Sequence, residues 1–311
     1  MRVGEDRRVA LQRALMGLRA TVKFDEMLAR HTTFVIGGPA DVYVVVDDMI
    51  ALQAVVGFCR ECDVKLWVLG RGSNVLISDQ GLRGVVLRLA GELAAVQCRA
   101  EEAWIRAGAG ALLDSVADIA EENSLTGAEF LAGIPGTVGG ALRTNAGAFG
   151  RSLADIVEEV SAVDRNGKRV ELMRHQLRNE YRRPVVDVEL IVTAVKLRLH
   201  PGVTKPVSEL RQRRSQRHPK EPSAGSYFRN PSSEPAGRII ERCGMKGRQL
   251  GGARVSEQHA NFIVNVGNAS FSHVYELAEI VKANVEAQTG TELEEEVQIL
   301  PGYDDWGADW R

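Results

Sequence analysis

Apolar and polar positions in this chain follow two patterns: short apolar runs of strand length, and longer segments with helical spacing. The run 41–46 (DVYVVV) is rich in the β-branched residues that favour strands. Residues 48–62 instead carry apolar side chains at helical spacing, Leu52 and Val55 among them. Residues 65–69 again form an apolar run. The region after a charged helical leader is therefore predicted to begin as strand, helix and strand.

The same two patterns predict the remaining elements. Asn166-Gly167 favours a hairpin turn, because Asn-Gly accepts positive φ. His200-Pro201-Gly202 interrupts the pattern and predicts a boundary near residue 203. The expected strands are 75–77, 85–89, around 96, 103–107, 157–163, 169–172, 190–199, 261–265 and 296–300, and the expected helices are 112–123, 207–217, 235–243 and 272–288.

Composition and charge narrow the class of protein. The 311 residues are enough for two domains, and 44% hydrophobic with 26% charged residues is typical of a globular chain. Lys plus Arg number 39 against 41 Asp plus Glu, a net charge of −2, which argues against nucleic acid or an anionic membrane as partner. No apolar run approaches the roughly 20 residues of a membrane span, and the charged N-terminus does not resemble a signal peptide. We therefore expect a cytoplasmic protein.

Four cysteines give no disulfide framework. Cys59 and Cys62 form a C-x-x-C at the end of the predicted helix 48–62, whereas a redox pair is expected at a helix start, where the thiol pKa falls. Cys98 and Cys243 have no His or Cys neighbours at ligand spacing. Packing is the expected role of the C-x-x-C pair, and no metal site is expected.

Glycine is enriched, with 31 residues, and it gathers in three clusters at 36–39, 70–74 and 133–150. Gly70-Arg71-Gly72-Ser73-Asn74 lies between two predicted strands, where successive backbone N–H groups can converge on an anion; a simple tight turn explains it equally well. Val75 rules out a G-x-G-x-x-G fingerprint. Six glycines in residues 133–150 lose much backbone entropy on folding, which the close approach of a large polar cofactor explains. The three clusters predict a long ligand with a pyrophosphate, such as a dinucleotide.

Six segments occur in an order that identifies a family. They are HTTFVIGGPADV (31–42), LGRGSN (69–74), GIPGTVGGALRTNAGAFG (133–150), PSAGSYFRNP (222–231), GGARVSEQHANFIVN (251–265) and ELEEEVQIL (292–300). With them, from about Phe24 to Pro301, the chain resembles the UDP-N-acetylenolpyruvoylglucosamine reductases, also called UDP-N-acetylmuramate dehydrogenases, of the second type.

The resemblance implies an α+β fold: a two-subdomain FAD-binding domain of the vanillyl-alcohol-oxidase (PCMH) type, followed by a C-terminal α+β substrate domain. The expected division is a leader 1–23, an FAD-binding domain 24–203 with subdomains 24–92 and 93–203, a substrate-binding domain 204–301 and a tail 302–311.

The implied activity is NADPH-dependent reduction of UDP-N-acetylglucosamine enolpyruvate to UDP-N-acetylmuramate through non-covalent FAD. This step belongs to peptidoglycan precursor synthesis, and so to cell wall biogenesis, cell shape and cell division. Hydride reaches the vinyl carbon, and negative charge develops on the neighbouring carbon and its carboxylate, so the site needs donor groups and a proton donor. The expected partner is the UDP-sugar, and the expected state is a monomer. The alternatives are an oxidoreductase of this fold with another substrate, and a non-catalytic flavin-binding protein.

The family pattern assigns proton donation to Ser226 and further catalytic roles to Arg182 and Glu296. Taken alone, Ser226 is an ordinary turn hydroxyl, Arg182 a solvated arginine and Glu296 part of an acidic strand. The implied substrate contacts are Asn74, Tyr181, Arg182, Arg214 and His259, and the implied cofactor contacts are Ile36, Gly37, Gly38, Gly70, Arg71, Gly72, Ser73, Asn74, Gly133, Ile134, Pro135, Gly136, Thr137, Gly139, Gly140, Asn145, Ala146 and Gly147.

Two arginines have alternative interpretations, and several other positions differ from the family pattern. Arg211 and Arg214 share one face of the predicted helix 207–217, which also fits a solvated basic face or a nucleic-acid patch. Several positions depart from the family and bear on substrate affinity more than on hydride chemistry: Thr144, Asn179-Glu180, Pro184 and Gln298.

Overall fold

The computed structural model describes residues 2–202 and 206–301, and they divide into two compact units. The sequence-predicted domains 24–203 and 204–301 stay a prediction, because compactness is a different criterion and the boundary near residue 203 lies outside the described residues, as does the tail 302–311. Unit 1 takes in the chain up to Asp25, Asp41–Arg71 and Arg83–Arg214, and unit 2 takes in Glu26–Ala40, Gly72–Leu82 and the chain from Ser215 onward.

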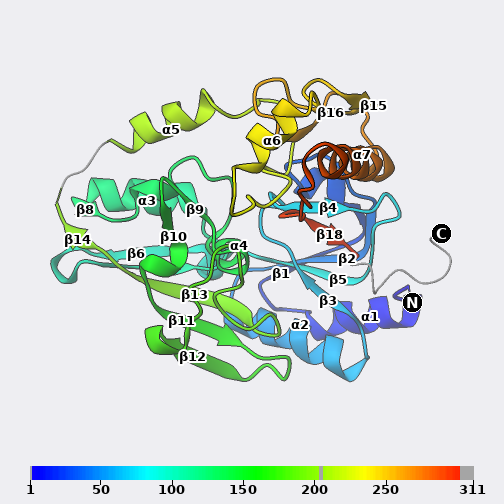
Figure 1. The fold of residues 1–311 in the computed structure, drawn as a ribbon. Helices are drawn as coiled ribbons and strands as arrows, with labels where there is room; N and C mark the ends of the chain where they lie inside the picture. The colour runs from blue at the N-terminus through cyan, green and yellow to red at the C-terminus, as the bar shows by residue number, and fades with distance from the viewer. Residues whose placement is uncertain (1, 203–205, 302–311) are drawn as a thin grey trace. The chain divides into compact units, whose positions relative to one another are not determined.

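One sheet of unit 1 has the order β1-β2-β5-β3. Its strands are β1 (Ala20–Met27), β2 (Pro39–Val46), β3 (Leu66–Val68) and β5 (Leu82–Leu89). Helices α1 (Glu5–Ala14) and α2 (Met49–Glu61) lie side by side in this part (Figure 1). The strand, helix and strand predicted from residue 41 are confirmed as β2, α2 and β3, but β5 lies between β2 and β3 and pairs in parallel with β3.

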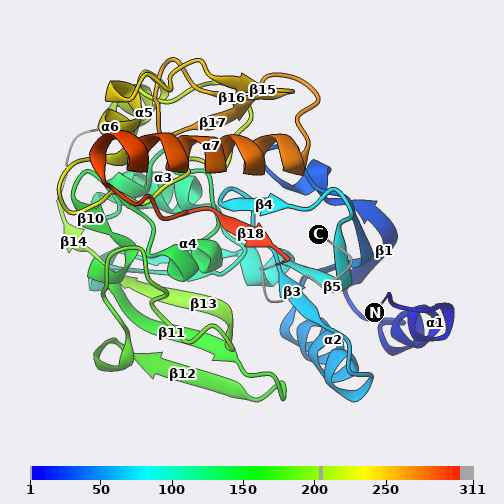
Figure 2. The ribbon, with the colours of Figure 1, turned by 45° about the vertical axis from the view of Figure 1, so that its right-hand side comes forward.

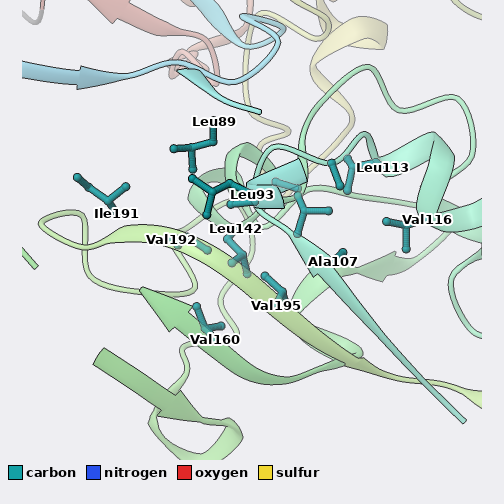
Figure 3. Close-up of a cluster of buried hydrophobic side chains, with 14 of the residues drawn as sticks. Leu89, Leu93, Ala107, Leu113, Val116, Leu142, Val160, Ile191, Val192 and Val195 are labelled. Atoms are coloured by element: carbon teal, nitrogen blue, oxygen red, sulfur yellow. The ribbon is translucent and has the colours of Figure 1, made fainter. Parts of the chain in front are cut away.

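The second sheet of unit 1 is antiparallel throughout, with the order β12-β11-β13-β7-β6. Helices α3 (Leu113–Glu122) and α4 (Val138–Thr144) cover one face of it (Figures 1 and 2). Figure 3 shows the core that results, in which Leu142 of α4 and Val116 of α3 lie with Val195 of the sheet. The strands are β6 (Val96–Arg99), β7 (Trp104–Gly108), β11 (Val157–Val163), β12 (Arg169–Met173) and β13 (Ile191–Arg198).

Unit 2 has its own core. Tyr227, Phe228 and Leu76 are fully buried there, against the apolar face of α7 (Phe271–Thr289). Figure 2 shows α7 running beside the small antiparallel sheet β15-β16-β17. The other elements of unit 2 are β4 (Val75–Ile77), which pairs in parallel with β18 (Gln298–Leu300), β15 (Gln249–Leu250), β16 (Ala253–Val255), β17 (Ile263–Asn265) and α6 (Ala236–Arg242).

Short elements complete the fold. They are β8 (Leu125–Thr126), β9 (Gly147–Ala148), β10 (Arg151–Ser152), β14 (His200–Pro201), α5 (Val207–Ser215) and the 3-10 turns η1 (Leu28–His31), η2 (Gly91–Ala94), η3 (Ala100–Glu102), η4 (Glu129–Leu131), η5 (Leu153–Asp155) and η6 (Arg174–Gln176).

Several elements differ from the sequence prediction, among them a helix, an early strand and the last strand. The region expected to be a glycine-rich loop contains α4, whose N-cap is Thr137. Strand β1 was not predicted. Its half-buried and exposed positions alternate, but charged residues occupy several of them and hide the alternation of apolar and polar residues. The last strand begins at Gln298 rather than at residue 296, so Glu296 is not a strand residue. In the described part of the chain, no helix combines the length and the apolar content needed to cross a membrane.

Candidate functional site

In unit 1, the glycine loop after β3 meets the N-terminus of α4. A Cβ at Gly70 would lie 2.4 Å from the Oγ1 of Thr137, the N-cap of α4, so glycine is required by this contact. Within residues 2–202 and 206–301, the backbone N–H groups of Gly70, Arg71, Gly136 and Thr137 donate to no protein acceptor. Two loops thus meet and leave several N–H donors available, which is the donor set of an anion-binding cradle.

Arg71 adds a charge to this cradle. Its side chain makes neither a hydrogen bond nor an ion pair within the described residues. The diphosphate of FAD needs donors of this kind, so these residues fit the cofactor that the sequence implied.

Other glycines of the predicted cofactor loop have a different explanation. A Cβ at Gly139 would lie 2.9 Å from the Cβ of Ala109, and one at Gly147 would lie 2.1 Å from the carbonyl oxygen of Arg151. At these two positions the chain's own packing requires glycine. The entropy argument that attributed the whole cluster to a cofactor is therefore wrong for them, although their cofactor role stays a prediction.

A pair of arginines forms a second feature of unit 1. The Nη1 of Arg182 donates to the carbonyl oxygen of Asn145 at 3.2 Å, and its guanidinium lies 5.4 Å from the ring centroid of Tyr181. Arg214 makes no ion pair in the described residues, and burial, together with the nearby charge of Arg182, lowers its pKa to about 10. Gly133 leaves room for this side chain, since a Cβ there would lie 3.1 Å from the Arg214 Cδ.

Arg211, on the same helix, differs from Arg214 because it is paired with carboxylates. One turn earlier on α5, Arg211 bonds to Asp114 at 2.8 Å and to Asp118 at 2.6 Å. The bond to Asp118 is the main reason that its pKa is raised. The structure thus places Tyr181, Arg182 and Arg214 together, with a half-buried cation that no carboxylate of the described residues neutralises. An anionic ligand is what such a pair of cations would bind.

Unit 2 places Asn74, Ser226 and Glu296 on neighbouring segments. The Asn74 Nδ2 donates to the carbonyl oxygen of Glu296 at 3.0 Å, and the Glu296 N–H donates to the carbonyl oxygen of Tyr227 at 2.8 Å. The hydroxyl of Ser226 is half-buried and makes no hydrogen bond within the described residues. The side-chain amide of Asn74 thus supports the chain at Glu296. The Ser226 hydroxyl, which has no partner among the described residues, belongs to the residue before Tyr227, whose carbonyl accepts from the Glu296 N–H.

Sequence reasoning missed the residue that holds this arrangement. Asn261 is only 3% exposed, its Oδ1 accepts from the Phe228 N–H at 3.0 Å, and its Nδ2 donates to the Phe228 carbonyl at 2.8 Å. An asparagine in the apolar run 261–265 was the available signal, since buried amides need partners.

His259 and the third glycine cluster also belong to unit 2. Burial lowers the pKa of His259, and its ring packs 4.9 Å from that of Phe262 while its Nδ1 accepts from the Asn261 N–H. In the cluster, the Gly38 N–H donates to the Ser78 carbonyl and the Ile36 N–H to the Thr32 hydroxyl. These contacts are structural, and the predicted ligand roles of His259, Ile36 and Gly38 stay predictions.

In the C-x-x-C pair, Cys59 takes the packing role that the sequence predicted. Cys59 lies in the core of unit 1, and burial raises its pKa to about 12. The raised pKa disfavours the thiolate, which is the reactive form of a cysteine. No group of three or more His, Cys, Asp or Glu in the described residues is placed to hold a metal ion.

Comparison with known proteins relates both parts of the chain to one family. Residues 40–173 match the model of an FAD binding domain, and residues 217–300 match that of the UDP-N-acetylenolpyruvoylglucosamine reductase C-terminal domain. The reductase of Caldanaerobacter subterraneus subsp. tengcongensis is 40% identical over 282 residues, 89% of this chain and 92% of that protein. The reductase of Syntrophus aciditrophicus is 40% identical over 286 residues, 90% of this chain and 92% of that protein.

Solved structures agree. The UDP-N-acetylenolpyruvylglucosamine reductase of Thermus caldophilus superimposes with a TM-score of 0.76 at 34% identity, over 91% of this chain and all of that one. A glucose dehydrogenase, wild-type Phl p 4.0202, shares the fold alone, with a TM-score of 0.50 at 18% identity over 63% of this chain and 44% of that one. The predicted FAD-binding PCMH-type fold is confirmed, and the chain belongs to the family of UDP-N-acetylenolpyruvoylglucosamine reductases.

Proposed function

We propose that this protein reduces UDP-N-acetylglucosamine enolpyruvate to UDP-N-acetylmuramate, with NADPH as reductant and FAD as cofactor, in peptidoglycan precursor synthesis. The observation that carries the proposal is the arginine pair of unit 1, in which Arg214 lies beside Arg182 and, in the part of the chain that the structure describes, has no carboxylate to neutralise it. A substrate that bears a carboxylate and a diphosphate supplies the missing negative charge. The family relation, which covers 89% of this chain and 92% of the relative, supports the same substrate.

The cradle at Gly70 and Thr137 would hold the FAD diphosphate through backbone N–H groups, with Arg71 as an added cation. When bound, FAD supplies the hydride that is taken from NADPH and passed to the vinyl carbon. The chain itself must hold FAD, bind the substrate and supply the proton. The close contact of Gly70 with Thr137 keeps the two loops together and so fixes the direction of their donors.

Three side chains would serve the reacting atoms. Arg182 stabilises the negative charge that develops on the substrate carboxylate, and Ser226 donates the proton to the neighbouring carbon. Glu296 would supply a carboxyl group that hydrogen-bonds the charge developing on the substrate, without a net proton transfer of its own. The hydroxyl of Ser226, which bonds to no described residue, and the backbone bonds that hold Glu296 support these roles.

We further propose that the enzyme acts as a monomer in the cytoplasm, where NADPH and UDP-sugars are supplied. Asn74, Tyr181 and Arg214 would contact the substrate, and His259 would contribute from its aromatic cluster.

A test begins with the visible spectrum of the purified protein, in which bound flavin is expected. NADPH oxidation is then followed with and without UDP-N-acetylglucosamine enolpyruvate, and the product is weighed by mass spectrometry. A gain of two hydrogens that depends on both reagents supports the proposal. Bound flavin without substrate-dependent oxidation would instead indicate another substrate or a non-catalytic flavin protein.

A further inference from the structure

Asn145 ends α4 and connects it to the loop that carries Arg182. It is 3% exposed and adopts a left-handed conformation, with φ of 44°. Its Oδ1 accepts from the Ala154 N–H at 3.1 Å, and its Nδ2 donates to the Glu180 carbonyl at 3.0 Å. Its own carbonyl accepts from Arg182. Asn145 thus makes two contacts to this loop. It bonds to the backbone at Glu180, two residues before Arg182, and to the guanidinium of Arg182.

The loop needs such support. Arg182 has φ of 52°, a left-handed conformation that a non-glycine residue keeps only when its surroundings enforce it. The far end of the loop is held by Arg143, also from α4, whose guanidinium donates to the carbonyl oxygens of Asp187, at 3.0 Å, and Leu190. The C-terminal turn of α4 therefore holds the loop on both sides of Arg182.

We propose that Asn145 is a positioning residue for Arg182: its side-chain amide fixes the loop backbone so that the guanidinium is presented to the substrate. The inference rests on the proposed function, because it assumes that Arg182 serves the substrate. The role follows from the Asn145 side chain, whose oxygen and nitrogen are both bonded to protein groups. The predicted cofactor contact of this residue stays a prediction, which the FAD affinity measured below tests.

The test uses Asn145→Asp in the FAD-loaded enzyme. Aspartate keeps the acceptor for Ala154 but loses the donor to Glu180, so the helix contact survives and the loop contact does not. Asn123→Asp is the matched control, since Asn123 also ends a helix of unit 1 and its Nδ2 donates to a backbone carbonyl, that of Ile119 at 2.8 Å. Asn145→Gly, which accepts the left-handed φ, removes the amide without adding charge.

Flavin absorbance reports the two half-reactions separately in stopped flow. We expect reoxidation by the UDP-sugar to slow by about 10- to 100-fold in both Asn145 variants, the effect of losing one buried hydrogen bond and the geometry it maintains. Flavin reduction by NADPH and FAD affinity should change by less than about threefold, and the control should match wild type. In an Arg182→Gln background, the Asn145 substitution should add little further slowing, because it acts through Arg182.

Three outcomes overturn the inference: unchanged reoxidation in both Asn145 variants, loss of FAD affinity in proportion to the loss of rate, or full additivity with Arg182→Gln. Failure of the proposed function looks different, since wild-type enzyme would then not reoxidise with the UDP-sugar at all.

Discussion

Two buried asparagines hold the two segments that carry predicted catalytic residues, and they do so in different ways. In unit 2, Asn261 bonds both the N–H and the carbonyl of Phe228, inside a core where Phe228 and Tyr227 are fully buried. In unit 1, Asn145 bonds a surface loop in which Tyr181 is 61% exposed.

The difference indicates which segment is rigid. The Ser226 segment is stabilised by the same packing that folds unit 2, so it opens only when much of that unit unfolds. The Arg182 loop is held by a few side-chain and backbone bonds and leaves Tyr181 exposed, so we expect it to open more easily than the Ser226 segment. A proton donor requires fixed geometry, whereas the cationic loop, fixed beside Arg182 by Asn145, can still adjust around the exposed Tyr181 as an anionic ligand arrives.

The largest expected effect concerns the rigid segment. Ser226→Ala should slow flavin reoxidation by the UDP-sugar by about 10²- to 10⁴-fold, the usual contribution of a positioned general acid, and leave reduction by NADPH intact. Ser223→Ala, three residues earlier and without a side-chain hydrogen bond in the described residues, is the control. Equal slowing of both half-reactions in Ser226→Ala would remove Ser226 from its assigned role.

A second prediction compares two arginines of α5. Arg214→Gln should raise the KM for the UDP-sugar by about 10- to 100-fold, the effect of losing one or two charge-assisted hydrogen bonds. It should not destabilise the protein, because the native state holds this cation at a lowered pKa. Arg211→Gln should lower the urea midpoint and leave KM nearly unchanged, since Arg211 is satisfied by Asp114 and Asp118. The reverse pattern would place the anion site at Arg211.

The third prediction concerns how much Asn261 contributes to the free energy of unfolding. Asn261→Ala leaves the buried N–H and carbonyl of Phe228 without partners, which should reduce the free energy of unfolding by about 2–4 kcal/mol. Asn284→Ala on α7, where among the described residues the amide oxygen accepts from Gln288 alone, should remain within about 0.5 kcal/mol of wild type in the same urea titration. A loss below about 1 kcal/mol in Asn261→Ala would mean that the Ser226 segment is not rigidly held.

Periodicity predicted most of the elements, because helices such as α2, α3 and α7 bury one apolar face. It did not predict α4, whose seven residues include Gly139 and Gly140 and whose start depends on the Thr137 cap. The six segments identified the family, but spacing alone could not separate Arg211 from Arg214. Their different environments come from α3, which supplies Asp114 and Asp118 about 95 residues earlier in the chain. Asn145 and Asn261 also act through contacts that no local pattern contains.

The smallest expected effect is the acid response of the Arg182 loop. Asp155 accepts from the Ser152 N–H at 2.7 Å and from the Nδ2 of Asn179 at 3.3 Å, next to Glu180. Burial alone would raise the pKa of Asp155, but these hydrogen bonds outweigh it and the pKa is lowered. A lowered pKa in the folded state means that the stabilisation is present above the ordinary aspartate pKa of about 3.9, and is lost as pH falls through the folded value.

Because Asp155 is exposed, the loss should be below about 1 kcal/mol and confined to the loop. Hydrogen exchange between pH 5 and 3 should therefore show, after correction for intrinsic rates, a fall in protection at the Arg178 N–H, which bonds to the Val185 carbonyl. Protection of the Phe228 N–H should not change. Asp155→Asn should remove the pH dependence at Arg178. If both amides lose protection at the same pH, the two segments open together, and the distinction between a rigid proton-donor segment and an adjustable cationic loop is wrong.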